Sequence, residues 1–393
     1  MTTIFEFVRS QTLLFRPVGK YLFPWFPYTE SFIVHQFALF FMILIAITNG
    51  IGMVLYIFYG ELEDPLDITL CACYWTFVID FLVKVFAIYV GRLSLQKAFK
   101  HLKDIHPIKD VSQEAFRLNA YLGVYKKWKK LMFLMNFLCL MLLNFMPFTK
   151  SLVEYLATPT SQRAFNYELP FPCFNPMQMT HPAIYVLSYI IQIYVSYYLA
   201  SLNLGSDLLL ISLVHLLNMH FEYLGKSIRE FKYEQSFHLI KLLWPTFYFR
   251  FLSYSSSKRV NQVFSPAIFL NYFACGLVMC VMGFQMVSGV TADLLIKYLI
   301  LLTSVTLHVY GICLYGERMI TLSNEISDAY FGHQWYLAEN SYQKMVVLLI
   351  ARGQRPAHLT AFKFFTVTVE SFKTLVATTY QFFTLLNSTF NEE

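Results

Sequence analysis

The chain has 393 residues, of which 57% are hydrophobic and only 14% are charged, whereas roughly 25% are charged in an ordinary soluble domain. This composition excludes a water-soluble protein folded around a single core. The net charge is +6, but the basic residues are spread through the connections between apolar segments. Anionic lipid head groups account for that distribution better than nucleic acid does.

Long uncharged stretches recur along the chain and predict membrane-spanning helices. At ~1.5 Å rise per residue, each is long enough to cross a hydrocarbon core of ~30 Å. Five of them contain no Asp, Glu, Lys or Arg: 31–60, 131–149, 183–206, 260–292 and 298–316. Two further candidates, 68–90 and 361–390, carry two and three charged residues. The sequence therefore predicts an all-α membrane protein with seven transmembrane helices.

The positions of the basic residues predict the orientation of these helices. Most of the thirty Lys and Arg residues lie in the amino-terminal segment and in the second, fourth and sixth connections between the predicted spans. By the positive-inside rule, the amino terminus is then cytoplasmic and, after seven spans, the carboxyl terminus is extracellular. This orientation argues against a G-protein-coupled receptor, whose amino terminus lies outside the cell.

Several predicted segments extend beyond the membrane. Residues 183–219 contain one formal charge, Asp207, so the fourth span is expected to continue into the cytoplasm. The segment 231–252 is too polar for lipid and too apolar for water, which favours a packed cytoplasmic domain or a subunit interface. A separate amphipathic helix is predicted over 336–352. The external loop 149–182 is rich in proline, which predicts an ordered but irregular lid.

The sequence contains none of the usual signs of an enzyme or of a metal site. No nucleophile motif, paired His cluster or phosphate-binding glycine loop occurs, so we expect no catalytic activity and no cofactor. Of the seven cysteines, only Cys173 lies in the long external loop, and none has metal-ligand spacing. A disulfide bond from Cys173 to Cys71 or Cys73 stays open as an alternative to packed thiols.

A specific pattern appears near the carboxyl end. Its residues are Tyr315-Gly316, Ser323, Ala329-Tyr330, Trp335-Tyr336, Arg352, Pro356, Thr360-Ala361, Phe372, Tyr380 and Phe383-Thr384-Leu385-Leu386. This pattern resembles the signature of insect odorant receptors, and the inverted seven-span topology agrees with that family along the whole chain. The long insertion in the second cytoplasmic connection, typical of the shared co-receptor, is missing. The chain therefore resembles an odour-specific subunit.

The resemblance implies a ligand-gated, nonselective cation channel of four subunits in the plasma membrane of olfactory sensory neurons. The odour-specific subunit is expected to assemble with the co-receptor, and the seventh span of each subunit lines a central pore. The alternatives are a gustatory receptor of the same superfamily, or a seven-span transporter or metabotropic receptor.

The resemblance also places the odorant between the second, third, fourth and sixth spans, in the outer half of the bilayer. The residues expected to line the pocket there are Tyr74, Phe77, Leu142, Phe145, Met146, Tyr185, Tyr189, Gln192, Leu301, Val305 and His308. None of them is Asp, Glu, Lys or Arg, which predicts recognition of small neutral volatiles by shape and dispersion. Ordinary helix packing is the alternative for each residue.

Leu385, Ser388 and Thr389 share one face of the last predicted helix, because their spacings are three and four. The resemblance implies that this face narrows the pore, with a hydrophobic constriction at Leu385. The alternative is that Leu385 packs against a neighbouring span and that Ser388 and Thr389 are merely solvated residues at the end of the helix. Glu370 is expected to pair with Lys373 or with a neighbouring helix, or else to face the pore and attract cations.

Two features of the interior complete the predictions. Asp80 and Lys84 are four residues apart toward the cytoplasmic end of the second span, so we expect a structural ion pair. His308 is expected to be a hydrogen-bonded packing residue. The resulting organisation is a cytoplasmic amino-terminal segment (1–30), spans one to four with an external lid (31–219), cytoplasmic helical extensions with spans five and six (220–355), and a pore-lining seventh span with an external tail (356–393).

Overall fold

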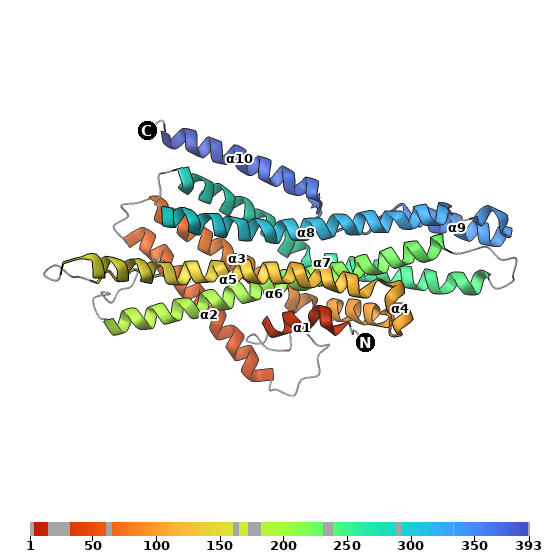
Figure 1. The fold of residues 1–393 in the computed structure, drawn as a ribbon, viewed down its shortest axis with the longest axis horizontal. Helices are drawn as coiled ribbons and strands as arrows, with labels where there is room; N and C mark the ends of the chain where they lie inside the picture. Colours follow the sequence, from red (N-terminus) through yellow and green to blue (C-terminus); the bar gives the residue numbers. More distant parts are fainter. Residues whose placement is uncertain are drawn as a thin grey trace.

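The computed structural model describes residues 4–14, 32–59, 65–159, 165–171, 182–230, 239–287, 292–332 and 334–391. Their backbone is almost entirely helical (Figure 1). The elements are α1 (Phe5–Leu14), α2 (Phe32–Tyr59), α3 (Pro65–Asp104), α4 (Asp110–Ala115), α5 (Leu118–Ala157), α6 (Pro182–Arg229), α7 (Leu239–Val287), α8 (Ala292–Gly332), the 3₁₀ helix η4 (Trp335–Leu337), α9 (Asn340–Gly353), β1 (Thr360–Ala361), β2 (Phe365–Thr366) and α10 (Val369–Asn391).

Seven of these helices correspond in chain order to the seven predicted spans. Among the described residues, α3, α5, α6, α7 and α8 are long and apolar enough to cross a membrane. The described part of α2 adds a shorter apolar stretch, Ile43–Phe58, and α10 occupies the position of the seventh span. The predicted all-α membrane fold is confirmed.

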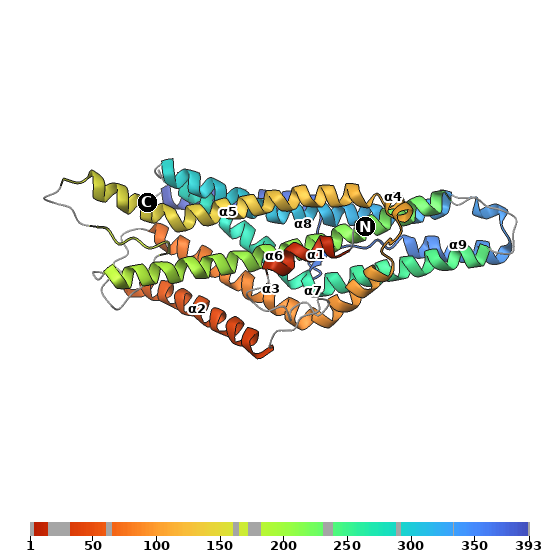
Figure 2. The same cartoon turned by 60° about the horizontal axis from the view of Figure 1, so that its bottom comes forward.

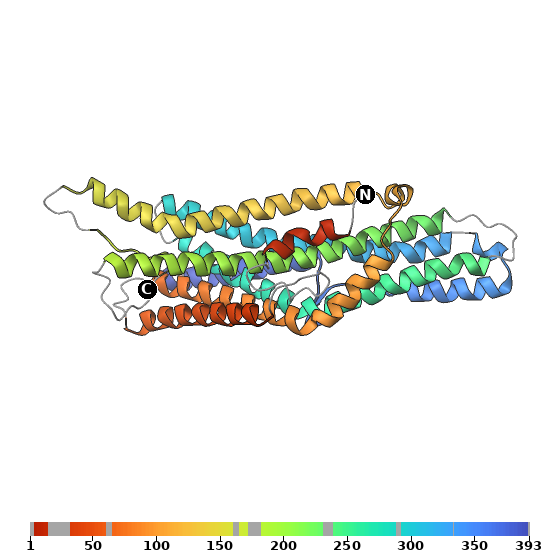
Figure 3. The same cartoon turned by 90° about the horizontal axis from the view of Figure 1, so that it is seen from below.

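The central helices are much longer than a bilayer requires, as expected for 183–219. The helix α6 has 48 residues and α7 has 49, so at ~1.5 Å per residue each is about 70 Å long. One end of the bundle therefore consists of the extended parts of α6, α7 and α8 together with α9, while α2 and α10 lie in the opposite half (Figures 1 and 3). We call these the α9 end and the lid end.

The helix α6 forms the core of the bundle. Every residue from Leu204 to Phe221 is buried, because α1, α3, α5, α7 and α8 all pack against this helix. Figure 2 shows α6 running through the length of the bundle. A helix that is apolar on all sides is stable only when it is enclosed in this way, so α6 fixes the positions of its neighbours.

The amphipathic helix predicted over 336–352 is present as α9, although its α-helical part starts at Asn340. Val346 and Leu349 are buried on one face. The Arg250 guanidinium of α7 holds α9 in place, because its Nη1 donates to the Leu349 carbonyl at 2.9 Å. The same guanidinium lies 5.4 Å from the centroid of the Tyr254 ring, a cation–π contact.

Several signature residues connect α8 to the segment that leads into α10. Gly316 allows the backbone of this segment to approach closely, since a Cβ at this position would lie 2.9 Å from the Val367 carbonyl oxygen. Ser323 Oγ accepts a hydrogen bond of 3.0 Å from the Ala357 amide, and Ala361 of β1 is fully buried. The antiparallel pair β1–β2 thus places the start of α10 against α8.

The lid differs in one respect from the expected irregular loop 149–182. The helix α5 continues to Ala157 with Pro147 inside it, so the first part of that loop is helical. The described part of the remainder, 165–171, has no regular secondary structure. Cys173 and the side chain of Cys71 lie outside the described residues, and so does a disulfide bond between these two cysteines. Cys73 is a buried free thiol, so the alternative pairing of Cys173 with Cys73 is wrong.

Candidate ligand-binding site

A cavity of about 190 Å³ lies between α3, α5, α6, α7 and α8, with the described lid residues at one end. An engineered protein cavity of about 150 Å³ holds one benzene molecule, so this volume suits a small volatile compound. The apolar part of its wall is formed by Cys73, Tyr74, Phe77, Cys139, Leu140, Leu143, Pro170, Phe171, Leu199, Ala200, Ala274, Met282, Leu301, Val305 and Val309.

Five of the eleven predicted pocket residues line this cavity: Tyr74, Phe77, Leu301, Val305 and His308. The α5 residues Leu142, Phe145 and Met146 do not. The residues of α5 that do line it are Asn136, Cys139, Leu140 and Leu143, which lie on the adjacent face of the helix. The segment 131–149 is apolar on every side, so its sequence does not indicate which face turns inward.

The three α6 residues predicted for the pocket instead hold the lid and α5. Gln192 exchanges two hydrogen bonds of 3.1 Å with the backbone of Phe171. The Tyr185 hydroxyl donates to the Glu168 carbonyl at 3.1 Å, and the Tyr189 hydroxyl donates to the Asn144 carbonyl of α5. These contacts position Phe171, which does line the cavity.

A buried cluster of charged groups closes the deep end of the cavity. The predicted pairing of Asp80 with Lys84 is confirmed, with 2.8 Å between Lys84 Nζ and Asp80 Oδ2. Lys84 Nζ also lies 3.0 Å from Asp207 Oδ1 of α6. His308 Nδ1 of α8 lies 3.0 Å from Asp207 Oδ2, and Asn271 of α7 donates to Asp207 Oδ1 at 3.0 Å. The cluster therefore joins α3, α6, α7 and α8.

The expectation of a wall without Asp, Glu, Lys or Arg is wrong for this cavity, because Asp80, Lys84, Asp207 and Lys297 belong to its lining. The three charges at the deep end, Asp80, Lys84 and Asp207, are tolerated because they are paired and hydrogen-bonded to one another. Asp207 is the partner that the sequence prediction missed. The sequence feature that could have revealed Asp207 is that it is the one formal charge within 183–219.

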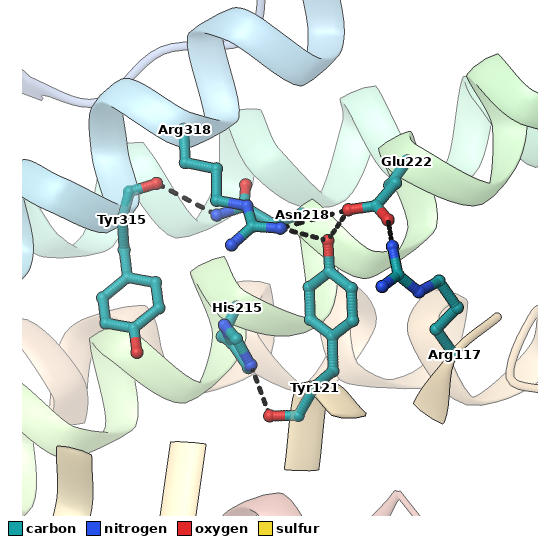
Figure 4. Close-up of polar contacts among 7 residues, drawn as sticks. All are labelled: Arg117, Tyr121, His215, Asn218, Glu222, Tyr315 and Arg318. Carbon is teal, nitrogen blue, oxygen red and sulfur yellow. Dashed lines mark hydrogen bonds and ion pairs between the residues drawn. The ribbon is translucent and has the colours of Figure 1, made fainter. Parts of the chain in front are cut away.

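The part of α6 beyond its predicted span leads toward the α9 end in Figure 1 and carries a second polar cluster, which is drawn in Figure 4. Glu222 accepts hydrogen bonds from the Tyr121 hydroxyl and from Arg318 Nη2, the latter at 3.1 Å, and pairs with Arg117 at 3.2 Å. Burial alone would raise the pKa of Glu222. The hydrogen bonds and the two guanidinium groups outweigh burial and lower this pKa below its ordinary value.

Glu222→Gln is expected to lower the free energy of unfolding by about 1 kcal/mol, since it leaves two guanidinium groups without their carboxylate. Because the folded-state pKa is lowered, the stabilisation is present at neutral pH and is lost as the pH falls through that lowered value. Thermal unfolding of the purified protein measures the change. The control is Glu325→Gln, which removes an exposed pair with Arg229 and should change stability by less than about 0.5 kcal/mol. Equal effects of both variants would contradict the assignment.

The helix α10 packs against α7 and α8 along one side. Tyr272 OH of α7 lies 2.9 Å from Ser371 Oγ, and the Val369 amide donates to Glu317 of α8 at 2.8 Å. Farther along α10, Gly283 of α7 permits close approach, since a Cβ there would lie 3.3 Å from the Phe383 ring.

The opposite side of α10 is left exposed by the described residues of this chain. This side is strongly polar for a helix that occupies the position of the seventh predicted membrane span. It carries Glu370, Lys373, Thr374, Thr378, Gln381, Thr384, Leu385 and Ser388. The predicted pairing of Glu370 with Lys373 is confirmed at 3.2 Å. Leu385 is 61% exposed and Ser388 is exposed. The side chain of Thr389 lies outside the described residues.

Comparison with known proteins identifies the family. A family model described as 7tm odorant receptor matches residues 65–380. Odorant receptor 85b of Drosophila melanogaster is 26% identical over 87% of this chain and 88% of its own length. Odorant receptor 67c of the same insect is 26% identical over 86% of this chain and 84% of its own.

The fold is also that of a solved structure, the insect olfactory receptor OR5 from Machilis hrabei in complex with eugenol. The two chains superpose with a TM-score of 0.82 over 98% of each, at 14% sequence identity. The resemblance predicted from the carboxyl-terminal pattern is confirmed. By a match over most of its length, the chain belongs to the odorant receptor family, whose members are multi-pass membrane receptors and not enzymes.

Proposed function

We propose that this chain is the odorant-binding subunit of a heteromeric, ligand-gated, nonselective cation channel in olfactory sensory neurons. The observation that carries the proposal is the position of α7 and α8, which lie between a cavity of volatile-molecule size and the polar face of α10. In this proposal the α9 end is cytoplasmic, the lid end is extracellular, and small neutral volatiles occupy the cavity.

The polar face of α10 supports a pore. Hydroxyl, amide and charged side chains are costly against lipid tails, and the described residues of this chain leave them exposed. Several copies of α10 around a central axis would turn these faces toward water and permeant cations. Leu385 would then form a hydrophobic constriction near the outer end.

The contacts of α7 provide a physical connection between ligand and pore. Asn271 and Met282 of this helix line the cavity. On its other side, Tyr272 contacts Ser371, and Gly283 faces Phe383 of α10. A ligand that shifts α7 would therefore move the helix that α10 packs against.

Assembly would involve the α9 end. The cluster around Glu222 and the docking of α9 through Arg250 make this end a rigid packed unit, which is suitable for holding subunits together while the lid end moves. The partner subunit in this proposal is the shared odorant receptor co-receptor, and membrane lipids surround α2, α3 and α5.

Expression of this chain with and without the co-receptor tests the proposal. Odour-evoked current should require both chains, reverse near zero membrane potential and persist when G-protein signalling is blocked. Current that needs a substrate gradient would instead indicate a transporter, and loss of the response on blocking G proteins would indicate a metabotropic receptor. Either result would contradict the proposal.

A further inference from the structure

The deep end of the cavity carries a buried oxygen atom that none of the described residues satisfies. Asp80 is 4% exposed and lines the cavity. Its Oδ2 accepts from Lys84, whereas its Oδ1 has no hydrogen-bond partner among the described residues. A buried carboxylate oxygen left in this state is unfavourable, so a ligand that donates a hydrogen bond to Oδ1 would be strongly attracted.

The donors around Asp80 are already committed to other acceptors. Lys84 Nζ lies within 3.2 Å of both oxygens of Asp207 in addition to Asp80 Oδ2. The amide of Asn271 is directed to Asp207. His308 Nδ1 faces Asp207 Oδ2, and because a carboxylate can only accept, Nδ1 carries the hydrogen.

A second buried acceptor lines the same cavity. Asn203 precedes Asp207 by one helical turn on α6 and also lines the cavity. Its Oδ1 is buried and lacks a hydrogen-bond partner within the described part of the chain. Lys297 lines the cavity as well, but it is eleven residues before His308 on α8, about 16 Å along the helix. The deep end therefore offers acceptors to a ligand, and its charged donor is occupied.

We propose that this cavity selects odorants that carry a hydroxyl group, a neutral hydrogen-bond donor whose hydrogen is accepted by Asp80 Oδ1 or Asn203 Oδ1. The apolar body of the odorant lies between Phe77, Leu143 and Leu301. This inference rests on the proposed function, since it names the ligand class of the same cavity. An ether, ketone or ester presents its own acceptors to these oxygens and gains no hydrogen bond from them.

Three ligands with seven non-hydrogen atoms each test the proposal: hexan-1-ol, methyl pentyl ether and heptane. With the chain and the proposed co-receptor expressed together, the half-maximal concentration of hexan-1-ol should be lower than that of the ether by about tenfold or more. The same ligands are tested for stabilisation of the purified complex against heat, which reports binding without channel opening.

Two variants test whether Asp80 and Asn203 cause the preference for hydrogen-bond donors. In Asp80→Asn, the amide oxygen can still accept the hydrogen bond from Lys84, while the amide nitrogen takes the place of Oδ1. Because the amide nitrogen is a donor and not an acceptor, the preference for donor ligands should fall to within about twofold. Asn203→Leu should reduce it severalfold without altering the ion pairs. Asp110→Asn, an exposed carboxylate on α4, is the control and should leave the ratio unchanged. Because a ratio is measured within one variant, lower surface expression does not affect it.

The outcomes separate the two proposals. If hexan-1-ol, the ether and heptane act equally in the parent complex, the donor inference is wrong while the channel function stands. An unchanged ratio in both Asp80→Asn and Asn203→Leu would also overturn it. If no volatile evokes current, the proposed channel function fails, and the thermal measurement still decides whether the cavity prefers donors.

Discussion

Val305→Trp is expected to abolish the odour-evoked current while leaving surface expression and co-receptor assembly intact. Val305 lines the cavity, and an indole ring there would take up much of a volume of about 190 Å³. The ligand would then be excluded from the cavity by its size, whatever polar groups it carries. Concentration–response recordings across a panel of volatiles measure this effect.

The matched control is Val186→Trp, because Val186 is 52% exposed on the same bundle and lies outside the cavity lining. It should respond like the parent. Phe145→Ala is a second control, since Phe145 is 46% exposed and does not line the cavity; the ranking of odorants should not change. A normal response from Val305→Trp would place the ligand elsewhere.

Leu385→Ser is expected to raise the ligand-free current severalfold or to change ion permeability. A ring of leucine side chains at the constriction of a pore can stop conduction by excluding water. A serine hydroxyl at the same position would favour entry of water. Leu156→Ser serves as the control, because Leu156 has the same exposure of 61% but lies on α5. Its basal current should equal that of the parent.

Ser388→Cys examines the same face of α10 independently. Its thiol should react with an external charged thiol reagent and reduce the current, since Ser388 is exposed one turn beyond Leu385. If Leu385→Ser gates normally and the Ser388→Cys channel conducts unchanged after treatment, this face of α10 does not line the pore.

The elements were predictable because membrane insertion imposes a simple rule on composition. Uncharged segments of sufficient length give the helices. The second partner of Lys84 was missed, although Asp207 is the one formal charge within 183–219. The signature residues were recognisable for a different reason. Gly316, Ser323 and Ala361 pack the segment that leads into α10. They therefore report on how α10 is attached to α8 and carry no information about the ligand.

The ligand cavity was harder to predict because its wall is set by helix rotation. On α5, Leu142 and Leu143 are equally apolar, yet only Leu143 lines the cavity. The contribution of α7 through Asn271 and Met282 depends on how five helices pack together. Tyr185 has the composition of a pocket residue but supports the lid through Glu168. Such distinctions follow from tertiary packing and leave no periodic signal in the sequence.

The most direct test is a cryo-electron microscopy structure of this chain in complex with the proposed co-receptor, in the presence of an activating odorant. We expect ligand density within the cavity, in contact with Phe77, Leu143 and Leu301, together with the polar faces of α10 turned toward a central pore. Ligand density outside this cavity, or α10 facing lipid with no central pore, would contradict this expectation.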